Sequence, residues 1–311
     1  MSDEIRFDGR VAIVTGAGGG LGRTYAEELA RRGARVVVND LGGATDGTGG
    51  SSSMADETVK AIREAGGEGV ASYDSVATPE GGEAITQTAL DNFGGVDIVI
   101  NNAGILRDKS FAKLEPGDLE AILDVHLRGA FFVTQPAFRV MKERGYGRVL
   151  FTSSSSGIWG NFGQTNYGAA KTGLLGLSNV LSIEGAKSNI KSNVIAPAAH
   201  TRLTAGLGGS GEDADARAEA LRDPRQVTAL SCFLVSEACD LTHEVFAVGY
   251  GRVSRVFIGM APPWFHEGDG FASLEDIRDN LASIMNTDGF TIPKNTMDEM
   301  APVFARLQGK S

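Results

Sequence analysis

Short runs of apolar and β-branched residues alternate along the chain with longer stretches whose apolar residues recur at helical spacing. The short runs, which we expect to be strands, are 11–14, 35–38, 69–73, 97–101, 147–153, 190–195 and 244–249. The longer stretches, which we expect to be helices, are 21–32, 53–65, 79–93, 116–143, 165–187 and 224–236. This alternation predicts right-handed βαβ units and a parallel sheet. Strands that are apolar throughout predict that helices cover both faces, so we expect an α/β fold with a doubly wound sheet.

Three segments stand outside this alternation. Residues 41–52 are rich in glycine, threonine and serine and predict a loop. Residues 198–223 predict a second loop with a short helix. Beyond about residue 250 the alternation stops, and we expect a C-terminal helical extension over 261–311 after a main domain over 1–260. Its two short helices are expected near 273–285 and 296–307.

The charge of the chain narrows its partners. The formal net charge is −10 in 311 residues, and the pI is about 5.0. A non-specific nucleic-acid binder needs a basic surface, so we expect no nucleic-acid partner. The same sign opposes binding to an anionic membrane, and an anionic substrate would need a local basic patch.

The cysteines and the chain ends indicate a compartment. Cys232 and Cys239 lack the spacing of a zinc site, so we expect buried thiols in a reducing compartment and no metal. The N-terminal residues are charged, no apolar run approaches the ~20 residues that cross a bilayer, and the last three residues are not a peroxisomal signal. We expect a cytoplasmic protein.

A glycine-rich turn directly follows the first expected strand and opens the first expected helix. It reads Thr15-Gly-Ala-Gly-Gly-Gly-Leu-Gly22. Gly16, Gly20 and Gly22 permit a tight turn, close approach of the backbone to a pyrophosphate, and close packing of helix on strand. A glycine turn alone is a weak signal, but inside a βα unit it predicts dinucleotide binding and a Rossmann-type fold.

Polar residues after the next strands predict the rest of a cofactor site. Asp40 ends the second strand, where a carboxylate can bind both hydroxyls of the adenosine ribose and repel the extra phosphate of NADP. Arg23 would suit that phosphate, but it lies on the helix behind the glycines, so NAD is favoured. Asp74 could bond the adenine amino group, and Asn102-Ala-Gly104 could form a bed for the adenosine half.

A possible catalytic set follows the fifth expected strand. Tyr167 and Lys171 lie four residues apart on an expected helix and share one face. A nearby ammonium would lower the pKa of the phenol toward neutrality. Ser154 could hydrogen-bond the substrate oxygen as negative charge develops there.

The order of these motifs resembles the short-chain dehydrogenase/reductase family over about residues 7–250. The resemblance implies an oxidoreductase that moves a hydride between a secondary alcohol and a ketone, with Ser154, Tyr167 and Lys171 as the catalytic set. It also implies that Tyr167 and Lys171 contact the cofactor, Lys171 at the nicotinamide ribose. The further contacts that it implies are Gly19, Leu21, Ser75, Val76, Ala103, Pro197 and Thr201.

Several stretches resemble, more narrowly, the (3R)-hydroxyacyl-CoA dehydrogenase branch of that family found in multifunctional enzymes. They are 38–43 with the loop behind it, 102–108, 160–163 and 196–203. This resemblance implies NAD, a bulky acyl-CoA or steroid substrate, and a homodimer. A homotetramer also remains open.

His126 departs from the wider family, which carries an asparagine in a proton-relay role at this place, but the narrower branch also has histidine there. We expect either a water-holding or relay residue or a hydrogen-bonded packing histidine. His200 lies on the 198–223 segment and is a weaker candidate for the substrate site. The histidines show no metal spacing.

The sequence leaves several alternatives open. The substrate is a straight-chain (3R)-hydroxyacyl-CoA, a steroid side-chain acyl-CoA or a free 17β-hydroxysteroid. Arg107, Lys109, Lys113 and Arg128 form either a basic rim for CoA phosphates or ordinary surface charge. The extension over 261–311 is either a substrate cover or a dimer contact. A non-catalytic NAD-binding scaffold is the alternative from another functional class.

Overall fold

A computed structural model of the chain describes residues 4–199, 220–221, 223–267 and 270–308. The chain divides into two compact units, Met1–Arg255 and Val256–Ser311. His200, Thr201 and most of the expected loop over 198–223 lie outside the described residues.

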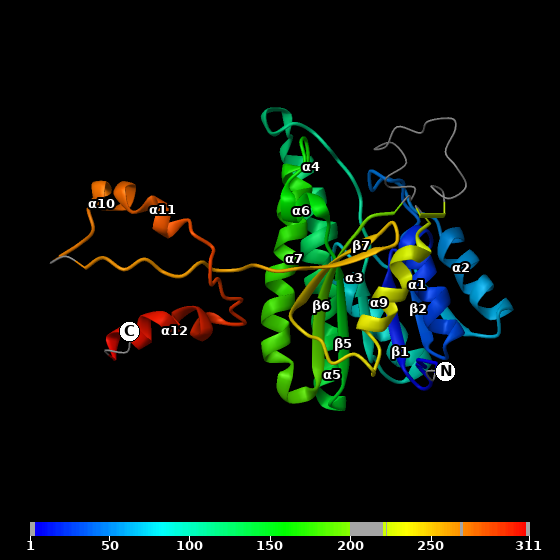
Figure 1. Cartoon of the computed structure of the whole chain (residues 1–311). Helices are drawn as coiled ribbons and strands as arrows, with labels where there is room; N and C mark the ends of the chain where they lie inside the picture. Colours follow the sequence, from blue (N-terminus) through cyan, green and yellow to red (C-terminus); the bar gives the residue numbers. More distant parts are fainter. Residues whose placement is uncertain (1–3, 200–219, 222, 268–269, 309–311) are drawn as a thin grey trace. The chain divides into compact units, whose positions relative to one another are not determined.

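The first unit is built on one eight-stranded sheet with the order β3-β2-β1-β4-β5-β6-β7-β8 (Figure 1). Pairing is parallel from β3 through β7. The strands are β1 (Val11–Thr15), β2 (Arg35–Asn39), β3 (Glu68–Ser72), β4 (Ile98–Asn101), β5 (Gly147–Thr152), β6 (Ile190–Pro197), β7 (Glu244–Gly249) and β8 (Arg252–Val256). The chain reverses its direction of winding between β1 and β4, which confirms the doubly wound sheet.

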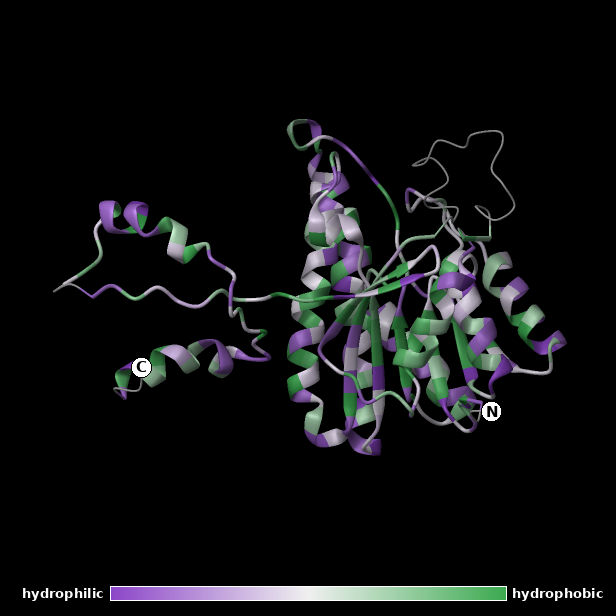
Figure 2. Ribbon diagram, in the orientation of Figure 1, coloured by the Kyte–Doolittle hydropathy of each residue, from purple (hydrophilic) through white to green (hydrophobic). Residues whose placement is uncertain are grey.

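Helices cover both faces of this sheet. One face carries α1 (Gly20–Arg31), α2 (Ser53–Glu64) and α9 (Arg225–Leu234), and the other carries α3 (Pro79–Phe93), α5 (Gly129–Arg144) and α7 (Thr165–Glu184). Alternate residues of each strand enter the two cores: Ala12 and Val14 face the first, whereas Val11 and Ile13 face the second. Figure 2 shows the matching hydrophobic colour along the central strands.

Two expectations about the elements were wrong. The stretch 116–143 is not one helix: α4 (Pro116–Leu123) and α5 are joined by a π-helical turn, η2 (Asp124–Arg128). An apolar stripe continues across such a turn, so periodicity does not reveal the extra residue. No strand is expected beyond residue 250, but β7 is followed directly by a further strand, β8, and the alternation of strand and helix stops there. The structure also adds α6 (Ser155–Trp159), η1 (Phe111–Lys113) and η3 (Ala186–Ser188).

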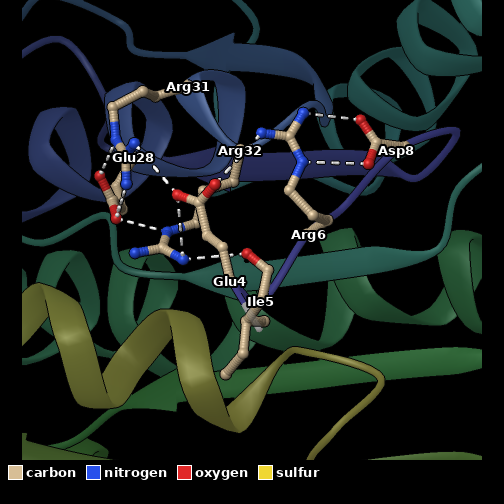
Figure 3. Close-up of polar contacts among 7 residues, drawn as sticks. All are labelled: Glu4, Ile5, Arg6, Asp8, Glu28, Arg31 and Arg32. Atoms are coloured by element: carbon tan, nitrogen blue, oxygen red, sulfur yellow. Dashed lines mark hydrogen bonds and ion pairs between the residues drawn. The ribbon is translucent and has the colours of Figure 1, made fainter. Parts of the chain in front are cut away.

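The N-terminal segment fastens the end of α1 that lies away from the glycine turn (Figure 3). Arg32 donates from its guanidinium to the carbonyl of Ile5 at 2.9 Å and to Glu28 at 2.5 Å. Arg31 binds Glu28 and reaches Glu4 at 3.3 Å. These contacts hold the C-terminal end of α1 against the segment that leads into β1. They therefore help to fix α1 relative to β1, the two elements that the glycine turn connects.

The second unit contains three helices, α10 (Leu274–Asp279), α11 (Leu281–Ile284) and α12 (Thr296–Leu307). Ser273 caps α10 in a capping box, and the ring of Phe257 stacks on that of Phe290 at 5.5 Å. None of the three helices buries a side chain. Across the described part of the chain, no helix has the length and apolar character needed to cross a membrane.

Candidate active site

A cleft of about 450 Å³ opens at the carboxyl ends of the central strands. This is the edge where ligands bind in open α/β sheets, next to the point where the strand order reverses. The residues expected in a cofactor or catalytic role that line it are Gly16, Gly19, Gly20, Leu21, Asp40, Asp74, Ser75, Val76, Asn102, Ala103, Gly104, His126, Ser154, Tyr167, Lys171 and Pro197.

Among the expected site residues that the structure describes, Gly22 alone does not line the cleft. A Cβ atom on Gly22 would stand 2.2 Å from the carbonyl oxygen of Gly16. Gly22 therefore allows α1 to pack directly on the turn, which is a packing requirement and not a ligand contact. Asn102 closes the same turn, because its side-chain amide donates to the carbonyls of Thr15 and Gly16 at 3.0 and 3.1 Å.

The start of α1 fits an anionic group. No side chain among the described residues caps this helix, and its first turn contains no acidic residue. Its leading N–H groups therefore keep their capacity to donate at the floor of the cleft. This chemistry suits the pyrophosphate of a dinucleotide.

Asp40 holds two parts of the cleft wall together. Its Oδ2 accepts a hydrogen bond from the N–H of Gly18 at 2.8 Å, and its Oδ1 accepts one from the N–H of Gly42 at 2.7 Å. Each carboxylate oxygen has a second lone pair, so the ribose hydroxyls can still be bound. Asp40 thus joins the glycine turn to the loop that begins at Leu41.

Ser154, Tyr167 and Lys171 converge at the other end of the cleft. Ser154 precedes α6, and its Oγ accepts from the N–H of Ser156 at 3.1 Å. Its hydroxyl also hydrogen-bonds the Tyr167 phenol. The Nζ of Lys171 lies 5.6 Å from the centre of the Tyr167 ring and donates to the carbonyl of Thr152 at 2.6 Å.

The pKa values of this group differ from the expectation. Burial raises the pKa of the Tyr167 phenol above its usual value, the Ser154 hydrogen bond opposes that rise, and the charge of Asp108 adds to it. Burial also lowers the pKa of Lys171 to about 7. The expected lowering of the Tyr167 pKa by Lys171 is not what this structure shows: burial is the largest cause of the shift, and the Lys171 ammonium, which donates to the carbonyl of Thr152, is not among its causes.

His126 lies in the π turn η2 and is buried. Its Nε2 lies 2.7 Å from the carbonyl oxygen of Ile105, and its ring meets the Tyr167 ring edge-on at 5.0 Å. Burial and the charge of Lys171 lower its pKa well below the usual value, so the imidazole is neutral. Its Nδ1 has no hydrogen-bond partner among the described residues. A small cavity of about 10 Å³ is lined by His126, Lys171 and Asn101.

Sequence reasoning missed part of the cleft. The loop after Asp40 forms a wall through Leu41, Gly43, Ala44, Thr45 and Gly47. It is held there because the carbonyl of Thr45 accepts from the N–H of Leu106, and that of Asp46 from the guanidinium of Arg107, both at 2.9 Å. Asn161 and Gln164 also line the cleft. They stand beside or within the stretch 160–163, whose resemblance was the only available signal.

The expected basic rim is largely paired with acids. Lys109 and Arg107 lie 2.7 and 3.7 Å from the carboxylate of Asp118, and Arg128 pairs with Asp124 one turn earlier. Because these three cations already have carboxylate partners, they give less support to a site for CoA phosphates than unpaired cations would.

With this geometry in place, the comparisons with known proteins decide the family. Residues 10–209 match the short chain dehydrogenase family. The chain belongs to this family. It is therefore an oxidoreductase that acts on CH–OH groups, and members of the family use a nicotinamide cofactor, NAD or NADP.

Individual relatives agree with this assignment. Peroxisomal multifunctional enzyme type 2 of Mus musculus is 53% identical over 256 residues, which are 82% of this chain and 34% of that enzyme. A short-chain type dehydrogenase/reductase of Mycobacterium tuberculosis is 48% identical over 288 residues, which are 91% of this chain and 96% of that protein. The solved structure of the full-length peroxisomal multifunctional enzyme type 2 from Drosophila melanogaster matches with a TM-score of 0.81 at 34% identity, covering 98% of this chain and 50% of that one. The chain thus spans about a third of the mouse enzyme and half of the fly enzyme.

Proposed function

We propose that this dehydrogenase oxidises the hydroxyl of a (3R)-3-hydroxyacyl-CoA to the 3-oxoacyl-CoA with NAD. The observation that carries the proposal is one continuous cleft that is lined at one end by the glycine turn and Asp40, and at the other by Ser154, Tyr167 and Lys171. When bound, the nicotinamide ring takes up or supplies the hydride.

The residues of the chain handle the proton and the oxygen. Tyr167 exchanges the proton with the substrate oxygen, and Ser154 hydrogen-bonds that oxygen as charge develops on it. Because burial raises the pKa of Tyr167, the phenol is well suited to give a proton to a ketone, and oxidation needs help from a neighbouring cation. We assign that role to Lys171, whose Nζ lies 5.6 Å from the centre of the Tyr167 ring. His126 holds a water or relays a proton through its unpartnered Nδ1.

The preference for NAD is assigned to Asp40. Its carboxylate, fixed by Gly18 and Gly42, presents negative charge where the 2′-phosphate of NADP would approach. Gly16, Gly19, Gly20, Leu21, Asp74 and the 102–104 turn complete the proposed cofactor contacts.

The acyl-CoA substrate is the less direct part of the proposal. It is supported by the stretches 38–43, 102–108 and 160–163, which lie on or beside the cleft. It is also supported by a relative from Mycobacterium tuberculosis that is named a hydroxyacyl-CoA dehydrogenase and is 37% identical over 259 residues, 80% of each chain. A straight-chain or a steroid side-chain acyl group is compatible with it. A free 17β-hydroxysteroid is the alternative that the paired basic rim favours, because Arg107, Lys109 and Arg128 already have carboxylate partners.

We further propose that the C-terminal extension over 261–311 covers the substrate or contacts a second subunit. Its helices bury none of their own side chains, so its apolar residues need a surface other than their own to pack on. A homodimer or homotetramer and a cytoplasmic location stay predictions, and the names of the mouse and fly relatives point to peroxisomes for those enzymes.

The test is a spectrophotometric screen for NADH and NADPH formation. It compares (3R)- and (3S)-3-hydroxyacyl-CoA thioesters of several chain lengths with free 17β-hydroxysteroids. Turnover of (3R)-thioesters with NAD supports the proposal, and activity restricted to free steroids rejects its acyl-CoA part. A lack of activity on every secondary alcohol would favour the scaffold alternative.

A further inference from the structure

We propose that Asn166 is a positioning residue that fixes the first turn of α7, and with it the Tyr167 hydroxyl, against the segment 105–118. The proposal rests on the proposed role of Tyr167 and goes beyond it, because Asn166 itself neither lines the cleft nor touches Ser154 or Lys171 among the described contacts.

Both the nitrogen and the oxygen of the Asn166 side-chain amide form hydrogen bonds. Its Nδ2 donates to the carbonyl of Arg107 at 3.1 Å and to that of Asp118 at 3.4 Å, and its Oδ1 accepts from the backbone N–H of Tyr167 at 2.8 Å. The side chain is 1% exposed. Since the first N–H groups of a helix lack partners within it, this bond satisfies the N–H of the residue proposed to transfer the proton.

The segment that Asn166 binds is itself held from the other side of the cleft. Leu106 and Arg107 bind the loop that walls the cofactor end, through the carbonyls of Thr45 and Asp46. Gln164, at the start of α7, adds a 2.7 Å hydrogen bond from its Nε2 to Asp108. Asn166 is therefore, with Gln164, a buried link between the segment that holds the loop at the cofactor end and the helix that carries Tyr167.

These hydrogen bonds set the position of the Tyr167 hydroxyl in the cleft. An error of about 1 Å in the place of a reacting group can cost about 10²-fold in rate. Loss of the Asn166 amide frees the first turn of α7 to shift, while the glycine turn and Asp40 keep their own contacts. The rate of turnover should therefore fall more than the affinity for the cofactor.

The chain offers a matched control in Asn193 on β6. This side chain is also 1% exposed, donates to the carbonyl of Leu241 at 2.9 Å and accepts from the N–H of Glu244 at 3.2 Å. It lies outside the cleft lining. A substitution here removes the same kind of buried amide without touching the helix of Tyr167.

The experiment compares Asn166→Ala and Asn193→Ala in the full chain. We expect both to lower Tm, with kcat for (3R)-3-hydroxybutyryl-CoA and NAD falling at least about tenfold in the Asn166 variant and less than about twofold in the Asn193 variant. The Kd for NAD should stay within about threefold in both. Asn166→Ser, whose hydroxyl can accept from the Tyr167 N–H, should recover part of kcat. Equal kcat values for the two alanine variants would overturn the proposal.

A second readout separates this idea from the proposed function. In protein labelled at tyrosine Cζ, the NMR signal of Tyr167 is the one that Tyr167→Phe removes. Asn166→Ala should shift that signal, and Asn193→Ala should leave it in place. An unmoved Tyr167 signal in the Asn166 variant contradicts positioning, whether or not the thioester is a substrate.

Discussion

A Cβ atom on Gly104 would come within 2.5 Å of Cε1 of His126. The turn that follows β4 and the histidine of the π turn therefore occupy adjoining space, and glycine is the residue that leaves room for the ring. The π turn and the Asn-Ala-Gly turn are fitted to each other at the cleft.

The Gly104–His126 contact leads to a double-variant prediction. Gly104→Ala should displace the imidazole and lower kcat by about tenfold or more, since displaced groups in a site cost rate steeply. His126→Asn, with its smaller side chain, should restore part of that loss in the combined variant. The control is Gly117→Ala, where an added Cβ meets nothing within 4 Å. Kinetics in which Gly104→Ala equals Gly117→Ala would contradict the close fit.

Tyr167→Phe should abolish turnover and leave the Kd for NAD within a few-fold. The phenolic oxygen transfers the proton, whereas the cofactor is held chiefly by the glycine turn and Asp40. Lys171→Ala should damage both turnover and cofactor binding, because its ammonium is assigned to both. Steady-state kinetics and a fluorescence titration with NADH measure the two effects. Proton-transfer groups are typically worth about 10²–10⁴-fold, so a Tyr167→Phe rate above about a tenth of wild type would show that the assigned role is wrong.

The buried ammonium of Lys171 predicts a dependence of stability on pH. Burial lowers its pKa to about 7 in the folded protein, compared with about 10.4 in an unfolded chain. Between these values the unfolded chain binds more protons, so this group makes the free energy of unfolding rise with pH. Its cost is complete below about pH 7 and fades toward about pH 10.

Lys171→Met should therefore stabilise the protein in the absence of added cofactor, and the gain should shrink by roughly 2–3 kcal/mol between about pH 6 and about pH 9. Urea denaturation at the two pH values measures it. Lys60→Met, on an exposed lysine, serves as the control and should show no such trend. A gain that is constant with pH, or grows as pH rises, would refute the assigned pKa.

The sequence was sufficient for β1 to β7 because most of these strands contain an apolar run bounded by polar or glycine residues. It was not sufficient for β8, whose five residues include two arginines and a serine. It was sufficient for most of the cleft because Gly16, Asp40, Asn102 and Ser154 each follow such a run, and parallel strands end at one edge. Tyr167 was found instead by its four-residue spacing from Lys171 on one helix. It could not reveal the π turn at His126, since one inserted residue leaves the apolar stripe intact. Nor could it reveal that burial controls the pKa values of Tyr167 and Lys171, because that depends on tertiary packing.

Replacing Asp40 should reduce the preference for NAD over NADP, measured as the ratio of the two kcat/KM values. Asp40→Ala and Asp40→Ser remove the negative charge that would repel the 2′-phosphate. Because both also remove the acceptor for the N–H groups of Gly18 and Gly42, KM should rise for NAD as well. Asp46→Ala, which removes a charge from the same loop without touching the glycine turn, should leave the preference unchanged. Equal kcat/KM for NAD and NADP in the unmodified protein would contradict this assignment.

Truncation after residue 260 distinguishes the two proposed roles of the C-terminal extension, and it leaves β8 (Arg252–Val256) intact. A substrate cover contributes binding to parts of the substrate that are remote from the reacting carbon. If the extension is a cover, the truncated protein should show a KM that rises far more for long or polycyclic thioesters than for (3R)-3-hydroxybutyryl-CoA, with little change in Tm.

A dimer contact predicts a different pattern, in which light scattering shows a smaller particle, Tm falls, and all thioesters lose activity in the same proportion. The matched control is Phe271→Ser, a fully exposed side chain of the extension, which should leave KM unchanged for the short thioester under either role. Identical KM values, Tm and particle size before and after truncation would reject both roles, because neither substrate binding nor subunit association would then depend on the extension.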